Sequence, residues 1–291
     1  MTILRSLLFV PGNQPRRIDK ALTLAPDAVI LDLEDACPIA EKVATRAVVV
    51  EALRRPRTCL GYVRINALAT DFSYGDLMAV VQPGVDGIML AKVEAADQLR
   101  TVDWLISQLE RERNLPPGHI DLLPLIETAK GFGGLDEIAR ACGRVRRLAF
   151  GAGDFTVDMG ISWSREETEL VAFRSSLALA SRNAGLEPPI DLAWIFLNDP
   201  QGFARSVEWG RTLGFQGKLC IHPDHIVPID TAFGPTAEQV ARAQRIVTAF
   251  GEAEANGTAA IQVDGMLVDY PIVLQARRVL ARSARIRART R

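Results

Sequence analysis

Residues 28–35 have the sequence AVILDLED, an aliphatic run that ends in three carboxylates. A continuous apolar run of this length predicts a strand buried on both faces, as strands of a parallel sheet are. The apolar residues of segments 16–24 and 39–54 recur with helical spacing, which predicts a helix on each side of the strand. We therefore expect a strand–helix unit whose acidic residues follow the strand.

The same pattern, an apolar run and then an amphipathic segment, recurs along the chain. The expected strands are residues 6–10, 28–33, 60–65, 87–90, 122–126, 148–151, 190–196 and 218–221. The clearest helical segments are residues 16–24, 39–54, 95–113, 135–142, 168–183, 202–213 and 237–254. Eight such units within about 250 residues favour an α/β fold of the (β/α)8 TIM-barrel type. An open doubly wound sheet is the alternative.

The pattern changes after the eighth unit. Residues 259–268 alternate loosely around Asp264-Gly265, a pair that favours a hairpin turn. Pro271 then predicts the start of a last helix, which ends near residue 285. We expect a catalytic barrel domain at residues 1–255 and a hairpin-plus-helix appendage at residues 256–291.

Composition limits the classes of function. The 291 residues are 48% hydrophobic, with 34 Lys and Arg against 35 Asp and Glu, and this balance gives no reason to expect nucleic-acid binding. No apolar run approaches the ~20 residues of a membrane span, and Pro11-Gly12 interrupts the N-terminal apolar segment too early for a signal peptide. The four cysteines include no C-x-x-C pair and are interpreted as reduced core residues of a cytoplasmic protein.

Polar side chains follow six of the eight expected strands. Barrel enzymes place their chemistry at the carboxyl ends of the strands, so these residues form the candidate site. Charges at a partly buried mouth also need partners. The residues are Asp32, Glu34 and Asp35 at the end of the second strand, Arg64 and Asn66 at the end of the third, Lys92 at the fourth, Glu127 at the fifth, Asp154 at the sixth and His222 at the eighth.

Glu127 and Asp154 follow adjacent strands, which lie about 4.8 Å apart in a sheet, so their carboxylates can meet. Two carboxylates this close repel each other unless a proton or a cation lies between them. Oxygen ligands alone suit Mg²⁺, with Mn²⁺ as an alternative ion. Two other interpretations stay open: an acid–base pair without a metal and, for either residue, an N-cap of the following helix.

Arg64 ends an apolar strand and must pair with an anion. We favour recognition of a substrate carboxylate, with Glu34 or Asp35 supporting the guanidinium group, over a purely structural pair. Lys92 either orients a metal ligand or forms a structural pair. Gly153 lets the backbone approach a ligand closely.

His222 and His225 could bind a metal together only on one helix, and Pro223 disfavours such a helix. We therefore interpret His222 as a structural residue or as a contact to a thioester substrate.

Six segments of the chain, residues 5–13, 32–36, 63–66, 125–129, 151–155 and 217–223, resemble together the citrate lyase β-subunit-like family of the HpcH/HpaI aldolase superfamily. This family includes malyl-CoA and citramalyl-CoA lyases, and the resemblance runs from about residue 4 to about residue 280. It implies a (β/α)8 barrel, commonly a homotrimer, in which Glu127 and Asp154 hold Mg²⁺ and Arg64 binds the substrate.

The resemblance also implies roles that spacing alone leaves unassigned. Asp269 matches a catalytic acid that reaches the active site of a neighbouring subunit, and a helix cap before Pro271 is the alternative. Phe9, Lys20 and the pair Ile221-His222 match contacts to the coenzyme A part of the substrate in the CoA-lyase branch.

The reaction that the resemblance implies is retro-Claisen cleavage of a β-hydroxyacyl-CoA. Citramalyl-CoA would give acetyl-CoA and pyruvate, and malyl-CoA would give acetyl-CoA and glyoxylate. The alternatives are a citrate lyase β subunit that acts on the citryl thioester of an acyl-carrier protein, a malyl-CoA thioesterase and a non-catalytic binding protein. The chain departs from the family pattern at Ala91-Lys92, Asp191-Leu192 and Gln14. These departures concern the choice of substrate rather than the metal site.

Overall fold

The computed structural model describes residues 3–289 and divides into two compact units. The barrel unit is Leu4–Ile229, and the C-terminal unit begins at Asp230.

Within the described residues, eight parallel strands close into a barrel in chain order, with β1 paired to both β2 and β8. This confirms the predicted (β/α)8 fold, and the alternative prediction of an open doubly wound sheet is wrong. The strands are β1 (Ser6–Pro11), β2 (Ala28–Asp32), β3 (Leu60–Ile65), β4 (Gly87–Leu90), β5 (Asp121–Ile126), β6 (Ala149–Phe150), β7 (Ile190–Asp191) and β8 (Gly217–Cys220).

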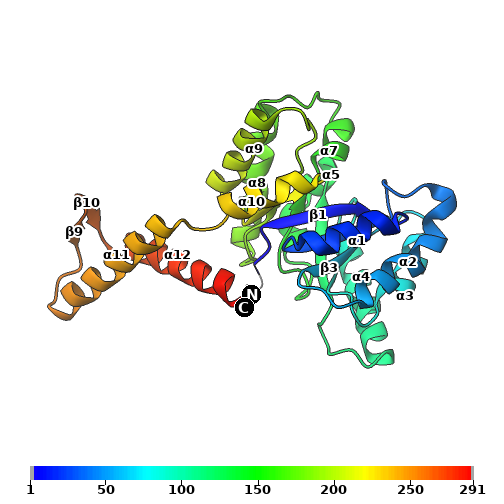
Figure 1. The fold of residues 1–291 in the computed structure, drawn as a ribbon, viewed down its shortest axis with the longest axis horizontal. Coiled ribbons are helices and arrows are strands. Elements are labelled where there is room, and N and C mark those ends of the chain that lie inside the picture. The colour runs from blue at the N-terminus through cyan, green and yellow to red at the C-terminus, as the bar shows by residue number, and fades with distance from the viewer. Residues whose placement is uncertain (1–2, 290–291) are drawn as a thin grey trace. The chain divides into compact units, whose positions relative to one another are not determined.

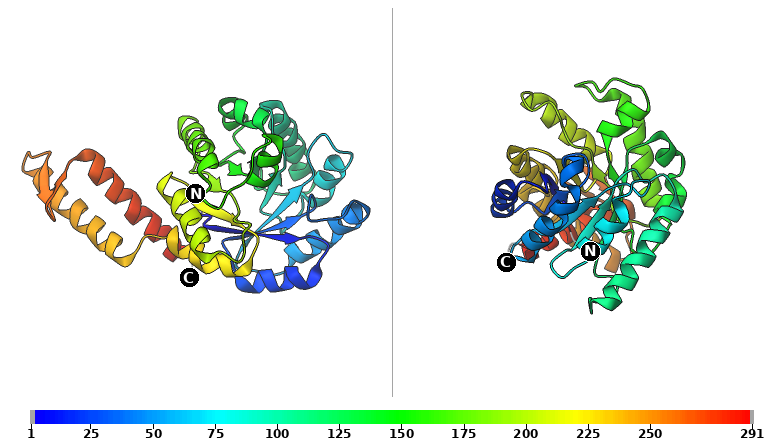
Figure 2. Two further views of the ribbon diagram at one scale, coloured as in Figure 1. Left: turned by 90° about the horizontal axis from the view of Figure 1, so that it is seen from above. Right: turned by 90° about the vertical axis from the view of Figure 1, so that its right-hand side faces the viewer.

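Helices follow the strands and surround them, as Figures 1 and 2 show. In a helix that covers a sheet, apolar residues three or four positions apart form one face that packs against the barrel. In α4 (Ala96–Glu112), the buried residues Leu99, Val102, Ile106 and Leu109 form this face. The remaining elements of this layer are α1 (Pro15–Leu24), η1 (Ile39–Glu41), α2 (Lys42–Arg54), α3 (Ser73–Val80), α5 (Ala129–Gly133), α6 (Leu135–Ala139), α7 (Ala152–Asp158), η2 (Thr168–Leu170), α8 (Val171–Asn183), α9 (Pro200–Thr212), η3 (Pro223–His225) and α10 (Ile226–Ala232).

Alternate strand residues fill the inside of the barrel. The buried cluster there is Leu4, Leu7, Ala28, Ile30, Tyr62, Met89, Leu123, Leu125, Ala149, Ile190 and Leu219. Strand side chains alternate between the two faces, so a residue two positions beyond an inward-facing one also faces inward. Asp32, Arg64 and Glu127 stand two positions beyond Ile30, Tyr62 and Leu125. The strand period therefore places these three charged groups at the carboxyl-end mouth.

The seventh strand is much shorter than the apolar run predicts. The prediction of a strand over residues 190–196 is wrong, because β7 contains only Ile190 and Asp191 and residues 192–199 form a loop. In that loop the Trp194 indole is buried, and its Nε1 donates a hydrogen bond to the carbonyl of Phe196 at 2.8 Å. The loop thus buries Leu192 and Trp194, whereas Ile195, which a strand buried on both faces would also cover, is exposed.

On the faces of β7 and β8 that point toward the helices, a buried set of charged side chains connects the two strands to the helix layer. The Nζ of Lys218 lies 2.6 Å from the Asp191 carboxylate, and the Arg174 guanidinium group contacts Asp191 and Glu167, each at 2.8 Å. All four side chains are at most 1% exposed. Two positive and two negative groups balance one another, as charges this deeply buried require.

The C-terminal unit is a pair of long helices with a hairpin between them (Figure 1). Its core is a cluster of Ala243, Ile246, Phe250, Val268, Val273 and Ala276. Asp264 and Gly265 both have positive φ, as the predicted hairpin turn requires. The elements are α11 (Ala237–Ala255), β9 (Ile261–Val263), β10 (Met266–Val268) and α12 (Tyr270–Arg289).

The division between the units differs from the predicted one. We expected the barrel domain to end at residue 255, whereas the compact units divide between Ile229 and Asp230. The physical reason is that α11 packs its apolar face against α12 and belongs to the second unit. Within residues 3–289, none of the helices combines the length and apolar character that a membrane crossing requires.

Candidate active site

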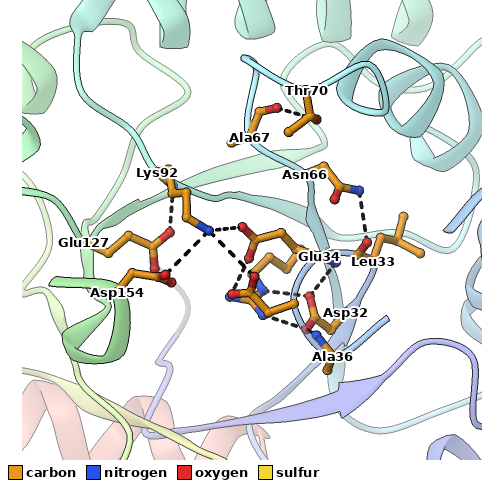
Figure 3. Close-up of polar contacts among 12 residues, drawn as sticks. Asp32, Leu33, Glu34, Ala36, Asn66, Ala67, Thr70, Lys92, Glu127 and Asp154 are labelled. Carbon is orange, nitrogen blue, oxygen red and sulfur yellow. Dashed lines mark hydrogen bonds and ion pairs between the residues drawn. The ribbon is translucent and has the colours of Figure 1, made fainter. Parts of the chain in front are cut away.

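Charged side chains that follow five different strands meet at the carboxyl-end mouth of the barrel (Figure 3). Figure 3 shows Asp32 and Glu34 of β2 and its following loop, Lys92 after β4, Glu127 after β5 and Asp154 of α7. Arg64 of β3 joins them through its ion pairs with Asp32 and Glu34. The structure therefore brings together the residues that the strand-end argument selected, with the exception of His222.

Arg64 and Asp32 are the innermost pair. They are register partners on β2 and β3, and two guanidinium nitrogens of Arg64 contact the two Asp32 oxygens at 2.7 and 2.6 Å. Burial opposes both charges, but this bidentate pairing outweighs it, lowering the pKa of Asp32 and raising that of Arg64. The Phe9 ring lies 5.0 Å from the Arg64 guanidinium carbon. Phe9, expected as a coenzyme A contact, thus also packs over this cation.

Glu34 lies between Arg64 and Lys92. One of its oxygens accepts a hydrogen bond from the Lys92 ammonium group, and the other lies 2.9 Å from an Arg64 nitrogen. Asp35 is more exposed and lies 3.5 Å from Arg64 and 3.7 Å from Lys92. Both expected carboxylate partners of Arg64 are therefore in place.

Two residues fix the loop that carries Glu34. The buried Lys42 ammonium group donates to the carbonyls of Leu33 and Glu34 at 2.9 and 2.6 Å. Asn66 donates to the Leu33 carbonyl at 3.0 Å (Figure 3). Sequence reasoning missed Lys42, because a single lysine at the start of a helix has the same sequence signal as an exposed one.

Lys92 also contacts the site through its backbone. Its φ is +51°, in the left-handed region that residues other than glycine seldom adopt. In this conformation its N–H donates to the Glu127 carboxylate at 2.7 Å, while its ammonium group lies 3.7 Å from Asp154. One residue therefore contacts both members of the predicted metal-binding pair.

Glu127 is 2% exposed, and Asp154 lies beside it (Figure 3). Burial, together with the negative charges of Glu34 and Asp154, raises the pKa of Glu127 to about 8. The Glu127 carboxylate lies against Gly151, where an added Cβ would be 2.4 Å from one of its oxygens. Gly151 thus provides the space that the carboxylate occupies.

Neither carboxylate is an N-cap, so that alternative is wrong. The N-cap of α5 is Thr128, whose side chain accepts from the Gly131 N–H. The N-cap of α7 is Gly151, and Asp154 lies in the first turn of that helix.

The charges at the mouth fit a divalent cation. Five carboxylates, counting Asp35, meet two basic groups, so negative charge remains next to Glu127 and Asp154. Within residues 3–289, no group of three or more His, Cys, Asp and Glu side chains is arranged to hold a metal ion. Two carboxylates nonetheless suit Mg²⁺, which keeps several water or substrate oxygens as ligands.

Four other predicted residues are not among these charged side chains, although Gly153 is the chain neighbour of Asp154. Lys20 is exposed on α1, and Gly153 is exposed on α7. Ile221 and His222 follow β8, where the His222 ring accepts a hydrogen bond from the Asp224 N–H at 3.3 Å. The roles of these four residues in binding remain predictions.

Asp269 belongs to the C-terminal unit. One of its oxygens accepts from the Ile272 N–H at 3.4 Å, at the start of α12. It therefore caps this helix, as the structural alternative requires, and its catalytic role remains a prediction.

Comparison with known proteins adds three findings. The profile of the family described as HpcH/HpaI aldolase/citrate lyase matches residues 5–223. The citrate lyase subunit beta of Leuconostoc mesenteroides subsp. cremoris is 36% identical over 95% of this chain and 92% of its own length. The (3S)-malyl-CoA thioesterase of Cereibacter sphaeroides (strain ATCC 17029 / ATH 2.4.9) is 32% identical over 98% and 96%.

Among solved structures, the protein CitE from Mycobacterium tuberculosis in complex with magnesium, acetoacetate and coenzyme A resembles this fold with a TM-score of 0.78. The two sequences are 28% identical, and the match covers 97% of this chain and 98% of that one.

Proposed function

The chain belongs to the HpcH/HpaI aldolase/citrate lyase family, and on this premise we propose that it is a Mg²⁺-dependent carbon–carbon lyase acting on the thioester of a hydroxylated dicarboxylic acid. The observation that carries the proposal is the pair formed by the buried Glu127 and the half-buried Asp154 at the barrel mouth, where Arg64 pairs with Asp32 and Glu34. Magnesium and coenzyme A are present in the CitE complex, which supports both as cofactor and substrate component here.

The proposed substrate is citramalyl-CoA, which would give acetyl-CoA and pyruvate, with malyl-CoA, which would give acetyl-CoA and glyoxylate, as the second choice. Both carry a hydroxyl group and a carboxylate on one carbon. Glu127 and Asp154 would hold Mg²⁺, which when bound supplies Lewis-acid polarisation of those oxygens.

In the proposed reaction, the hydroxyl group loses its proton and the adjacent carbon–carbon bond breaks. The hydroxyl carbon becomes the carbonyl of the 2-oxo acid, and the electron pair passes to the thioester fragment. Arg64 is positioned by Asp32 to stabilise the negative charge that develops on substrate oxygens. Protonation of the thioester fragment at carbon completes acetyl-CoA, so the cleavage consumes no other reactant.

We assign this last proton transfer to Asp269. We also propose that the enzyme is cytoplasmic and forms a homotrimer, in which Asp269 would enter the active site of a neighbouring subunit. Its cap on α12 fixes the side chain at the start of a long helix.

Two other functions have support from named relatives. A citrate lyase β subunit would act on the citryl thioester of an acyl-carrier protein, as the Leuconostoc relative suggests. A thioesterase would release free coenzyme A from malyl-CoA, as the Cereibacter relative suggests.

The test uses purified protein with Mg²⁺ and, in separate reactions, citramalyl-CoA, malyl-CoA and citryl-loaded acyl-carrier protein. Products are identified by mass spectrometry, with EDTA and the Glu127→Gln variant as controls. Acetyl-CoA with pyruvate or glyoxylate, abolished by both controls, supports the lyase. Free coenzyme A with an uncleaved acid would identify a thioesterase, and turnover of the carrier-bound citryl group alone would identify the citrate lyase subunit.

A further inference from the structure

The charges at the barrel mouth divide into two sets. Asp32 pairs with Arg64, and Glu34 pairs with both Arg64 and Lys92, so two carboxylates and two cations neutralise each other. Asp35 is 57% exposed and is screened by solvent. Among the residues that the structure describes, Glu127 and Asp154 form the pair whose side chains accept no hydrogen bond from a cationic side chain, although the Lys92 ammonium group lies 3.7 Å from Asp154.

Lys92 forms the boundary between these two sets. Its ammonium group donates to Glu34 and lies 3.7 Å from Asp154. A cation in place of that ammonium group would therefore meet the carboxylates of Glu34 and Asp154. Without the Lys92 side chain, a divalent ion could therefore bind either to Glu127 and Asp154 or to Glu34 and Asp154.

The backbone conformation of Lys92 indicates that its side chain has a role separate from the hydrogen bond that its N–H group donates. Its N–H fixes Glu127 from a left-handed conformation that glycine would adopt with less strain. Holding Glu127 through the backbone therefore does not require a lysine. The side chain is present despite the strain, and its ammonium group donates its hydrogen bond to Glu34 while lying 3.7 Å from Asp35 and Asp154.

We propose that Lys92 is a positioning residue that directs the divalent cation to Glu127 and Asp154 by occupying Glu34 with its own ammonium group. The inference rests on the proposed function, since it assumes that Glu127 and Asp154 bind the metal. It concerns the choice between two carboxylate pairs, which the proposed reaction leaves open.

The test measures Mn²⁺ binding to the purified full chain by electron paramagnetic resonance, without substrate. Glu127→Gln should weaken binding by roughly 100-fold, because it replaces a metal ligand with a neutral amide. Adding Lys92→Gly, which suits the left-handed backbone, frees Glu34 to bind the ion with Asp154. The double variant should therefore bind Mn²⁺ at least about ten-fold more tightly than Glu127→Gln alone.

Two controls make the result specific. Glu34→Gln in the double variant should remove the regained binding. Lys130→Ala combined with Glu127→Gln removes a lysine that pairs with Glu94 outside the mouth, and it should regain nothing. Circular dichroism establishes that each variant is folded.

A double variant that binds no more tightly than Glu127→Gln overturns the inference and leaves the proposed function standing. Regained binding that survives Glu34→Gln, or that Lys130→Ala also produces, overturns it as well. If Glu127→Gln binds Mn²⁺ as tightly as the wild type, the metal assignment of the proposed function fails, and this inference fails with it.

Discussion

Substituting Gly151 by alanine tests whether the space next to Glu127 determines metal binding. The new Cβ would lie 2.4 Å from a Glu127 oxygen and 2.8 Å from the Glu127 Cβ. Ordinary contact begins at roughly 3.4 Å, so the carboxylate must retreat by about 1 Å. Gly151 has φ −102° and ψ 90°, which alanine can also adopt. The expected effect of the substitution therefore comes from the clash with Glu127 and not from backbone strain.

A shift of this size is large for a magnesium ligand, because Mg²⁺ demands near-ideal geometry at 2.0–2.1 Å. We expect Gly151→Ala to weaken Mg²⁺ binding by about 10- to 100-fold. Overpacking at this buried position should also lower the free energy of unfolding by about 1–3 kcal/mol. Isothermal titration calorimetry with Mg²⁺ and urea unfolding of the metal-free protein measure the two effects.

Gly153 provides the matched control two residues away. An added Cβ there has nothing within 4 Å, and the residue is exposed in α7. Gly153→Ala should keep the Mg²⁺ affinity and gain up to about 1 kcal/mol of stability, because alanine favours the helix. Equal Mg²⁺ affinities in the wild type and Gly151→Ala would refute the argument that this glycine makes room for a metal ligand.

Three further predictions concern buried or proposed catalytic groups. Asp32→Asn removes the bidentate partner of the Arg64 guanidinium group, so it should cost about 3–5 kcal/mol in urea unfolding; a loss under 1 kcal/mol would contradict the pairing. The fold raises the pKa of Glu127 from 4.5 to about 8, so protonation of Glu127 stabilises the metal-free folded protein. This contribution to the free energy of unfolding is at most about 5 kcal/mol. It is fully present below pH 4.5 and is lost as the pH rises through 8. Unfolding free energies measured from pH 5 to 9 should therefore fall more steeply for the wild type than for Glu127→Gln, and parallel profiles would exclude the shift. Asp269→Asn should lower turnover by about 100-fold or more while leaving Mn²⁺ affinity unchanged, and full turnover would remove the proton-donor assignment.

The sequence predicts the barrel well because a strand buried on both faces leaves a clear apolar signal. It also predicts which charged residues reach the mouth, because inward and outward positions alternate along a strand. Asp32, Arg64 and Glu127 continue the inward faces of three strands. Their meeting thus follows from period and topology alone.

The errors have a common physical origin, since residue type does not specify burial or partner. An apolar run such as residues 192–196 can form a buried strand or a loop in which only some side chains are buried, and periodicity does not separate the two. Lys42 and Lys218 are buried and bonded, yet each has the sequence signal of an exposed lysine. The left-handed conformation of Lys92 is equally hidden, because lysine carries no signal for positive φ.

The buried charges behind β7 and β8 have a consequence for how the barrel closes. Lys218 and Asp191 face the helices from strands that share few backbone contacts, since β7 is only two residues long. A slip of β8 by one residue would turn Lys218 into the apolar interior and leave Asp191, Glu167 and Arg174 with one unbalanced negative charge. Such a misregistered closure would bury unpaired charges on both sides of the sheet. The ion pairs therefore select the correct alignment of the last strand when backbone pairing with β7 is too short to do so.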